Sequence, residues 1–144
     1  MKSRYTVIGD GPLIPNNLNI GETIQLIGRA FYFEQSKLKP KPEAINLCGM
    51  KLGVDLCAER YAQIYNIPYK HYYPKFEIDN KPVYQRNREM FQQTDCLIYF
   101  SFDRKFSNQD IQKDLLKMFL IGRKPVLYWD SYTHSFQYKT DLIF

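Results

Sequence analysis

Short apolar runs alternate with longer amphipathic segments along most of the chain. In the longer segments, apolar side chains recur three and four positions apart, which is the spacing of one buried helical face. The sequence therefore predicts helices at 22–33, 55–66, 84–93 and 110–120. The short runs have the composition of strands, and they end at Ile8, Cys48, Tyr73, Phe100 and Trp129.

This alternation predicts an α/β fold. Parallel strands need a crossover of about a dozen residues or more, usually a helix, and the segments between the runs are of that kind. We expect a Rossmann-like, doubly wound, mostly parallel sheet of about five strands, with residues 44–48 and 96–100 adjacent or nearly so. The chain of 144 residues suits a single domain, 1–144. Residues 131–144 can add a C-terminal edge element, through Phe136 to Tyr138.

The net charge of +5 favours an anionic partner. It does not distinguish nucleic acid from a phosphorylated small molecule, and the basic residues are scattered without a dense run. Aromatic residues make up 16% of the chain, more than one core of this size requires. We therefore expect self-association into a dimer or a small closed assembly. Stacking on a base is the competing use of some of these rings.

The three cysteines, Cys48, Cys57 and Cys96, have neither a CxxC spacing nor a zinc-site spacing. Buried thiols in a reducing compartment are the expected state. His71 and His134 have no partners at ligand spacing, so neither a metal site nor a cofactor is expected. The N-terminus lacks the apolar stretch of a signal peptide, and no window reaches the roughly 18 apolar residues of a membrane span. These features indicate a cytoplasmic protein without a membrane partner.

Ligands of parallel sheets bind beyond the carboxyl ends of the strands, so the turns after the predicted strands are the candidate sites. The most informative turn runs from Cys48 to Asp55. Its Gly49 and Gly53 let backbone approach a ligand, the following helix N-terminus favours phosphate, and Lys51 adds a full charge. An ordinary strand–helix turn capped by Asp55 explains the same residues equally well.

A second candidate is the start of the helix at 84–93. The guanidinium of Arg86 can clamp a phosphate or a carboxylate, and the amide of Asn87 offers both a donor and an acceptor. The competing interpretation is an internal ion pair of Arg86 with Asp55 or Glu59. If the ligand interpretation holds, Arg86→Ala and Gly53→Val weaken binding and leave the fold intact.

Taken in order, four segments resemble the SLOG superfamily, in particular its small YpsA-related and lysine-decarboxylase-like branch. The segments are CGMKLGVDLCAERYAQIYNIP, YYP, RNREM and TDCLIYF. The positions that match the family's motifs are Gly49, Gly53, Asp55, Arg86, Asn87, Met90 and Asp95. The opening IGDG at 8–11 resembles the family's first turn, and the resemblance extends from residue 5 to about residue 130. It implies a Rossmann-like fold that binds nucleotides or nucleotide-derived ligands. Some members hydrolyse N-glycosidic bonds, and others are sensors in conflict and defence systems.

One segment departs from the family. Enzymatic relatives carry a glycine-rich loop followed by Thr and Glu after the fourth strand, whereas residues 101–110 read SFDRKFSNQD. No residue is therefore assigned a catalytic role, and Arg104 supplies charge in place of backbone amides. We expect binding without turnover, including capture or sensing of a signalling nucleotide in a defence or counter-defence setting. The expected ligand-binding residues are Gly9, Asp10, Gly11, Gly49, Met50, Lys51, Gly53, Asp55, Arg86, Asn87 and Arg104.

Two alternatives stay open. The first is a hydrolase of an N-glycosidic or nucleoside-phosphate bond, which needs a carboxylate within reach of an attacking water. Asp55 and Asp10 are the candidates for that carboxylate. The second is a nucleic-acid-binding protein, which the positive net charge alone suggests.

Overall fold

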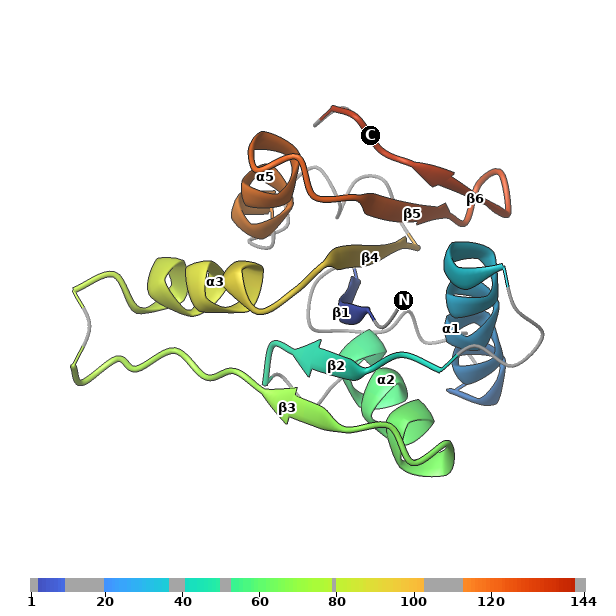
Figure 1. The fold of residues 1–144 in the computed structure, drawn as a ribbon, viewed down its shortest axis with the longest axis horizontal. Helices are drawn as coiled ribbons and strands as arrows, with labels where there is room; N and C mark the ends of the chain where they lie inside the picture. The colour runs from blue at the N-terminus through green and yellow to red at the C-terminus, as the bar shows by residue number, and fades with distance from the viewer. Residues whose placement is uncertain are drawn as a thin grey trace.

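The computed structural model describes residues 3–9, 20–36, 41–49, 53–78, 80–102 and 113–141. The strands within these ranges are β1 (Arg4–Gly9), β2 (Ala44–Leu47), β3 (Tyr69–His71), β4 (Cys96–Ser101), β5 (Val126–Asp130) and β6 (Ser135–Tyr138). The helices within them are α1 (Ile20–Gln35), α2 (Gly53–Ile64), α3 (Pro82–Gln92) and α5 (Lys113–Ile121). All of these strands belong to one sheet with the order β3-β2-β1-β4-β5-β6 (Figure 1).

The sheet confirms the predicted fold class. Strands β1 to β5 run parallel, and β6 pairs antiparallel with β5 at one edge. The predicted edge strand through Phe136 to Tyr138 is thus present as β6. Strands β2 and β4 are not direct partners, because β1 lies between them and pairs with both. The strand order reverses between β1 and β4, which makes their carboxyl ends the topological switch point where doubly wound folds bind ligands.

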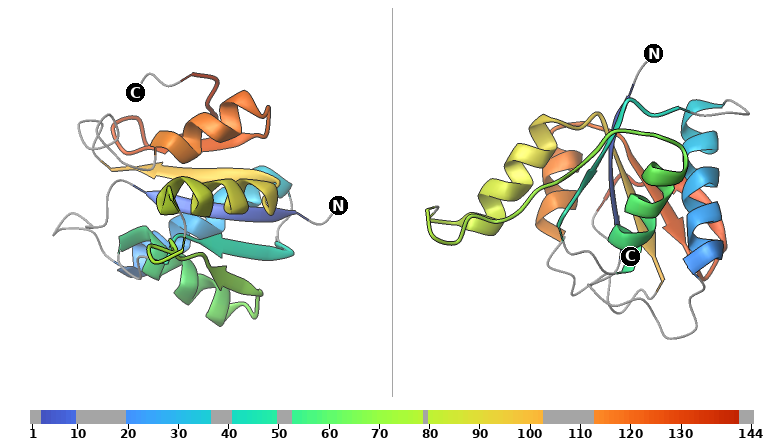
Figure 2. Two further views of the ribbon diagram at one scale, coloured as in Figure 1. Left: turned by 90° about the vertical axis from the view of Figure 1, so that its left-hand side faces the viewer. Right: turned by 90° about the horizontal axis from the view of Figure 1, so that it is seen from below.

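Helices cover both faces of the sheet, which explains why β4 and β5 are buried at every position. Figure 2 shows α1 and α2 on one side and α3 and α5 on the other. On the first face, Phe31 of α1 and Tyr61 of α2 pack together with Tyr5 of β1. On the second face, Met90 of α3 and Phe119 of α5 pack against the alternate side chains of the same strands. Alternation along each strand therefore supplies both cores.

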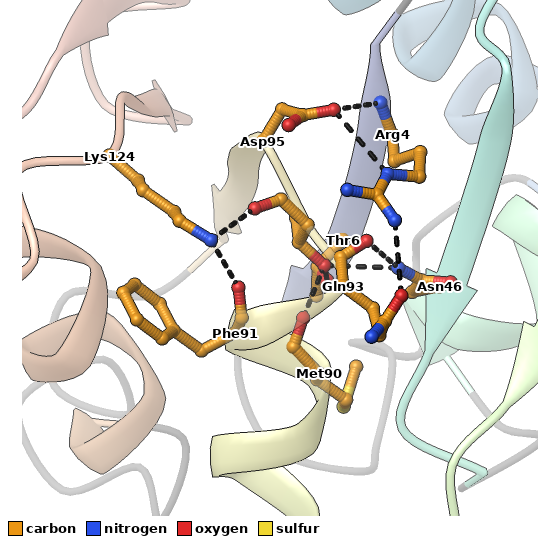
Figure 3. A network of polar contacts seen from close by, with 9 residues as sticks. Arg4, Thr6, Asn46, Met90, Phe91, Gln93, Asp95 and Lys124 are labelled. Carbon is orange, nitrogen blue, oxygen red and sulfur yellow. Dashed lines mark hydrogen bonds and ion pairs between the residues drawn. The ribbon is translucent and has the colours of Figure 1, made fainter.

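The C-terminal end of α3 is fixed to the amino end of the sheet by a polar network (Figure 3). Its members come from β1, β2 and the turn that leads from α3 into β4. Because α3 is held there, its N-terminal half extends toward the opposite edge of the sheet, where the strands have their carboxyl ends. The helix thus connects a structural region with the edge at which ligands are expected.

Helix boundaries differ from the predicted ones by one or two residues where the structure describes them. Helix α2 begins at Gly53, so Asp55 lies inside the first turn and not at the cap position. Helix α3 begins at Pro82, which suits proline because the first helical N–H has no intrahelical partner. Residues 110–112 of the predicted fourth helix lie outside the described residues. Within the described ranges, no helix has the length and apolar character that a membrane span requires.

Candidate functional site

The end of β2 is where the predicted site segments meet. Cys48, the residue after β2, donates its backbone N–H to Oδ1 of Asp55 at 3.1 Å. Its carbonyl oxygen accepts a hydrogen bond from Nη1 of Arg86 at 2.8 Å. The strand end is therefore held between the first turn of α2 and the N-terminal half of α3. The structure brings together the two segments that the sequence analysis singled out separately.

Arg86 is a buried cation whose bonds lie inside the protein. Only 5% of the residue is exposed, and Nε donates to Oδ1 of Asn87 at 2.9 Å. The described acceptors of Arg86 are the backbone carbonyl of Cys48 and the side-chain amide of Asn87. Arg86 therefore does not form the alternative ion pair with Asp55 or Glu59. Arg86 holds the end of β2 and orients the neighbouring amide. Its direct contact with a ligand stays a prediction.

Asn87 contains an unsatisfied donor. The residue is fully buried, and the bond from Arg86 fixes its Oδ1 as the acceptor. Its Nδ2 is buried as well, yet among the described residues it has no hydrogen-bond partner. Leaving such a group unpaired costs about 1–3 kcal/mol, so nearly all buried polar groups in proteins have partners. An unpaired amide donor at this edge of the sheet marks a place for an acceptor from outside the described chain.

Two of the predicted glycines are required by close packing within the protein. A Cβ at Gly9 would lie 2.3 Å from Cγ2 of Val54, so its absence lets the first turn of α2 approach the end of β1. Gly49 has φ of +80°, and a Cβ there would lie 2.7 Å from the ring of Tyr73. Gly53 has φ of +60°, in the left-handed region that disfavours valine. The expectation that Gly53→Val and Arg86→Ala leave the fold intact is therefore revised, because both changes disturb the framework of the site.

A histidine between two carboxylates lies beside this site. Nε2 of His71 is 3.1 Å from Oε1 of Glu59, and Nδ1 is 3.7 Å from Oδ2 of Asp55. The ring of Tyr73 stacks on the imidazole with a centroid distance of 6.0 Å. His71 is not among the residues predicted for the site, because it has no partner at ligand spacing along the chain. The available signal was the four-residue spacing of Asp55 and Glu59, which places both acids on one face of α2.

The two tyrosines after β3, Tyr72 and Tyr73, point to opposite sides, as alternation along an extended chain requires. Tyr72 is buried, with Nζ of Lys70 4.6 Å from its ring centroid. Tyr73 is 52% exposed and lies against Gly49 and His71, so its ring is the one placed for stacking at the site.

The side chains of the three cysteines are buried, as predicted, and burial raises the pKa of the Cys57 thiol. Within the described ranges, no group of three or more acidic, histidine or cysteine side chains forms a metal-binding cluster.

Five of the predicted ligand-binding residues cannot be placed. Asp10, Gly11, Met50, Lys51 and Arg104 lie outside the described residues. Residues 10–19 and 103–112, which follow β1 and β4 at the switch point, also lie outside the described residues. The structure places the other six, and it brings Gly49, Asp55, Arg86 and Asn87 together around the end of β2 through the contacts above.

Comparisons with known proteins leave the fold and the site as the only guides to function. No family model matches the chain, no curated protein matches it, and no solved structure matches its fold. The class that the fold itself defines is a doubly wound, Rossmann-like α/β domain with polar groups gathered at the carboxyl edge of its sheet.

Proposed function

We propose that this protein binds a nucleotide or a nucleotide-derived small molecule at the carboxyl edge of its sheet, without turning it over. The observation that carries the proposal is the buried, unpaired Nδ2 of Asn87 beside the guanidinium of Arg86. This donor lies close to the strand end that is bonded to α2, in a fold whose ligands bind at this edge. Membership of the SLOG superfamily is part of the proposal, and its support is the order of the motifs along the chain.

The chemistry of the site favours an anionic ligand with hydroxyl or carbonyl acceptors. The first turn of α2 offers backbone N–H groups and the positive end of the helix dipole, which together suit a phosphate. Arg86 adds a full positive charge within the same network. The Nδ2 of Asn87 requires an acceptor, such as a ribose hydroxyl or an oxygen of a base. The exposed ring of Tyr73 beside Gly49 supplies a surface for stacking.

Binding without turnover is supported by the state of the described carboxylates. Oδ1 of Asp55 accepts the N–H of Cys48, and Oδ2 faces His71. The hydrolase alternative needs a carboxylate that activates water, and its other candidate, Asp10, lies outside the described residues. The nucleic-acid alternative still has only the net charge in its favour. Capture or sensing of a signalling nucleotide in the cytoplasm is the biological form of the proposal, and buried free thiols suit that reducing compartment.

The test is to identify what the purified protein carries. Mass spectrometry of small molecules released on denaturation is expected to find a phosphorylated nucleoside, and calorimetry with that compound is expected to give one site per chain. AMP and ADP-ribose serve as probes if nothing is released. Asn87→Leu removes the unpaired donor, and Gln85→Leu removes an exposed amide from the same helix as the matched control. A protein that releases no nucleotide and binds neither probe would contradict the proposal, and so would equal affinities in the two variants.

A further inference from the structure

The segment between β3 and α3 forms an arm that carries exposed apolar side chains. Figures 1 and 2 show this segment extending away from the sheet and returning through α3. We define the arm as residues 74–78, which end in a turn closed by the bond from Ile78 N to Lys75 O at 3.1 Å. Phe76 is 72% exposed and Ile78 is 80% exposed. Two large apolar side chains at the end of a projecting segment are typical of a contact surface, because leaving them in water is unfavourable.

The same side of the molecule has an open groove between α3 and α5. The groove has a volume of about 710 Å³, and its apolar lining is formed by Tyr84, Phe91, Met118 and Ile121. Ile121 is 72% exposed, so one wall of the groove is an apolar surface without a cover within the described chain. The two helices meet at Phe91, whose ring packs edge-on against Phe119 at 5.1 Å. The groove is therefore a hollow between two packed helices.

We propose that the arm of one copy of this protein fills the α3–α5 groove of a second copy, and that the exchange is reciprocal. A closed dimer needs one surface that contains both halves of the contact, because the same patch serves each subunit. The arm precedes α3 in the chain, and α3 forms one wall of the groove, so the two halves of the contact share this helix. The arm does not occupy the groove of its own chain, since Phe76 and Ile78 are exposed. This inference is independent of the proposed ligand.

Each of the two elements carries two basic side chains and one acidic side chain. The segment leading into α3 carries Lys75, Glu77 and Lys81, and the groove is edged by Arg88, Asp114 and Lys117. None of these six residues has an ion-pair partner within the described part of its own chain. Each element thus offers both signs, so that Glu77 meets a basic edge and Asp114 meets a basic arm. An apolar centre with a polar, charged rim is the usual anatomy of a protein–protein interface.

The experiment measures the mass of the full chain in solution by analytical ultracentrifugation. We expect a dimer at micromolar concentration. The arm variant Phe76→Ser/Ile78→Ser and the groove variant Ile121→Glu are each expected to weaken the dimer by at least tenfold. All three side chains are strongly exposed, so the fold is retained, which circular dichroism checks. Ile64→Ser, at a 60% exposed position on α2, is the control that leaves the dimer unchanged.

Mixing the two variants separates arm exchange from every other dimer. In a mixed pair, the intact arm of the groove variant meets the intact groove of the arm variant, so one of the two contacts is restored. We expect the mixture to associate at a concentration where each variant alone is monomeric. A monomeric parent protein would overturn the proposal. It would also be overturned by variants that dimerise like the parent, or by a mixture that does not associate.

Discussion

The two ends of α3 are both held by buried polar groups, but one end leaves a buried donor without an acceptor among the described residues. At the C-terminal end, the hydroxyl of Thr94 donates to the carbonyl of Met90 at 2.6 Å. It accepts from Nδ2 of Asn46 at 3.0 Å, and it lies 2.8 Å from the hydroxyl of Thr6. Because the Thr94 proton is directed to Met90, the hydroxyl of Thr6 is the donor in the last pair. The second proton of Asn46 Nδ2 goes to the carbonyl of Gln93 at 3.1 Å.

A cation completes this closed end. Nζ of Lys124 donates to the carbonyls of Phe91 and Thr94 at 2.6 and 2.8 Å, which adds a charged donor to the carbonyls at and just after the end of the helix (Figure 3). A positive charge there is also favoured by the helix dipole. Burial lowers the pKa of Lys124 from its ordinary value, because the ammonium has left water. The network therefore fixes the helix and leaves no donor of Thr94 or of Asn46 Nδ2 for a ligand.

At the N-terminal end the network is open. Arg86 bonds to Cys48 and Asn87, and the chain of bonds stops at the buried Nδ2 of Asn87. A satisfied polar network stabilises and specifies a fold, whereas an unsatisfied one carries a free-energy cost that a partner removes. The comparison teaches that burial and polarity alone do not distinguish structural groups from binding groups. What distinguishes them is whether every donor has an acceptor.

The largest expected effect is on stability, from Arg86→Met. The change removes the hydrogen bonds that Arg86 donates to the Cys48 carbonyl and to the Asn87 amide oxygen, and losing the donor to a buried acceptor costs about 1–3 kcal/mol. We expect the free energy of unfolding to fall by about 2–5 kcal/mol, measured by urea denaturation. Arg88→Met, an exposed position on the same helix, is the control and is expected to change stability by less than about 0.5 kcal/mol. Similar losses in both variants would show that Arg86 does not hold the strand end.

Thr94→Val tests the closed end of α3. Valine keeps the shape of the side chain but removes the hydroxyl, so Thr6 and Asn46 each lose a partner. We expect a loss of about 1–3 kcal/mol in unfolding free energy, and no change in the affinity for the ligand. A variant that lost affinity but kept its stability would reverse the roles assigned to the two ends.

Asn87→Leu tests the open end and is expected to give the opposite pattern. The substitution loses the bond from Arg86 but also removes an unpaired buried donor, so stability changes by less than in Thr94→Val. Ligand affinity, measured by calorimetry, is expected to fall at least tenfold, about 1.4 kcal/mol. If Asn87→Leu binds as tightly as the parent and is as destabilised as Thr94→Val, the two ends do not differ in function.

The smallest effect on the free energy of unfolding at neutral pH is expected from Tyr61→Phe. Tyr61 is buried in the apolar core on the other face of the sheet. Burial raises the pKa of Tyr61 from 10.0 to about 12, with the nearby Tyr65 as a second cause. The stability linked to this group is fully present below pH 10 and is lost as the pH rises toward 12, because the unfolded chain releases the proton first. Urea midpoints between pH 8 and alkaline pH are expected to fall less steeply in Tyr61→Phe than in the parent. Parallel curves would contradict the assignment. Burial also raises the pKa of Tyr5 to about 12, so Tyr5 contributes to the slope that remains in Tyr61→Phe.

The sequence predicted the fold class because periodicity is a local property. Apolar alternation and helical spacing depend on neighbours a few positions away, so the strands, the crossover helices and the edge strand β6 were readable from the chain alone. The same reasoning predicted the turn around Gly49 and the start of α3 as site segments, and the structure brings these two segments together. It did not give the strand order, because nothing in a local pattern states that β1 lies between β2 and β4.

Only the tertiary structure decided what the site residues do. Arg86 and Cys48 are 38 positions apart, and their bond exists because the crossover from β3 to β4 places the N-terminal half of α3 beside the end of β2. His71 lies between Asp55 and Glu59 because β3 is the edge strand next to β2, against which α2 packs. In the part of the chain that the structure describes, the same packing leaves Nδ2 of Asn87 without an acceptor. Side-chain type fixes what a group can donate or accept, whereas its partner is set by how distant segments pack. For this protein, that packing separates the bonded residues of the candidate site from the one that we propose to bind the ligand.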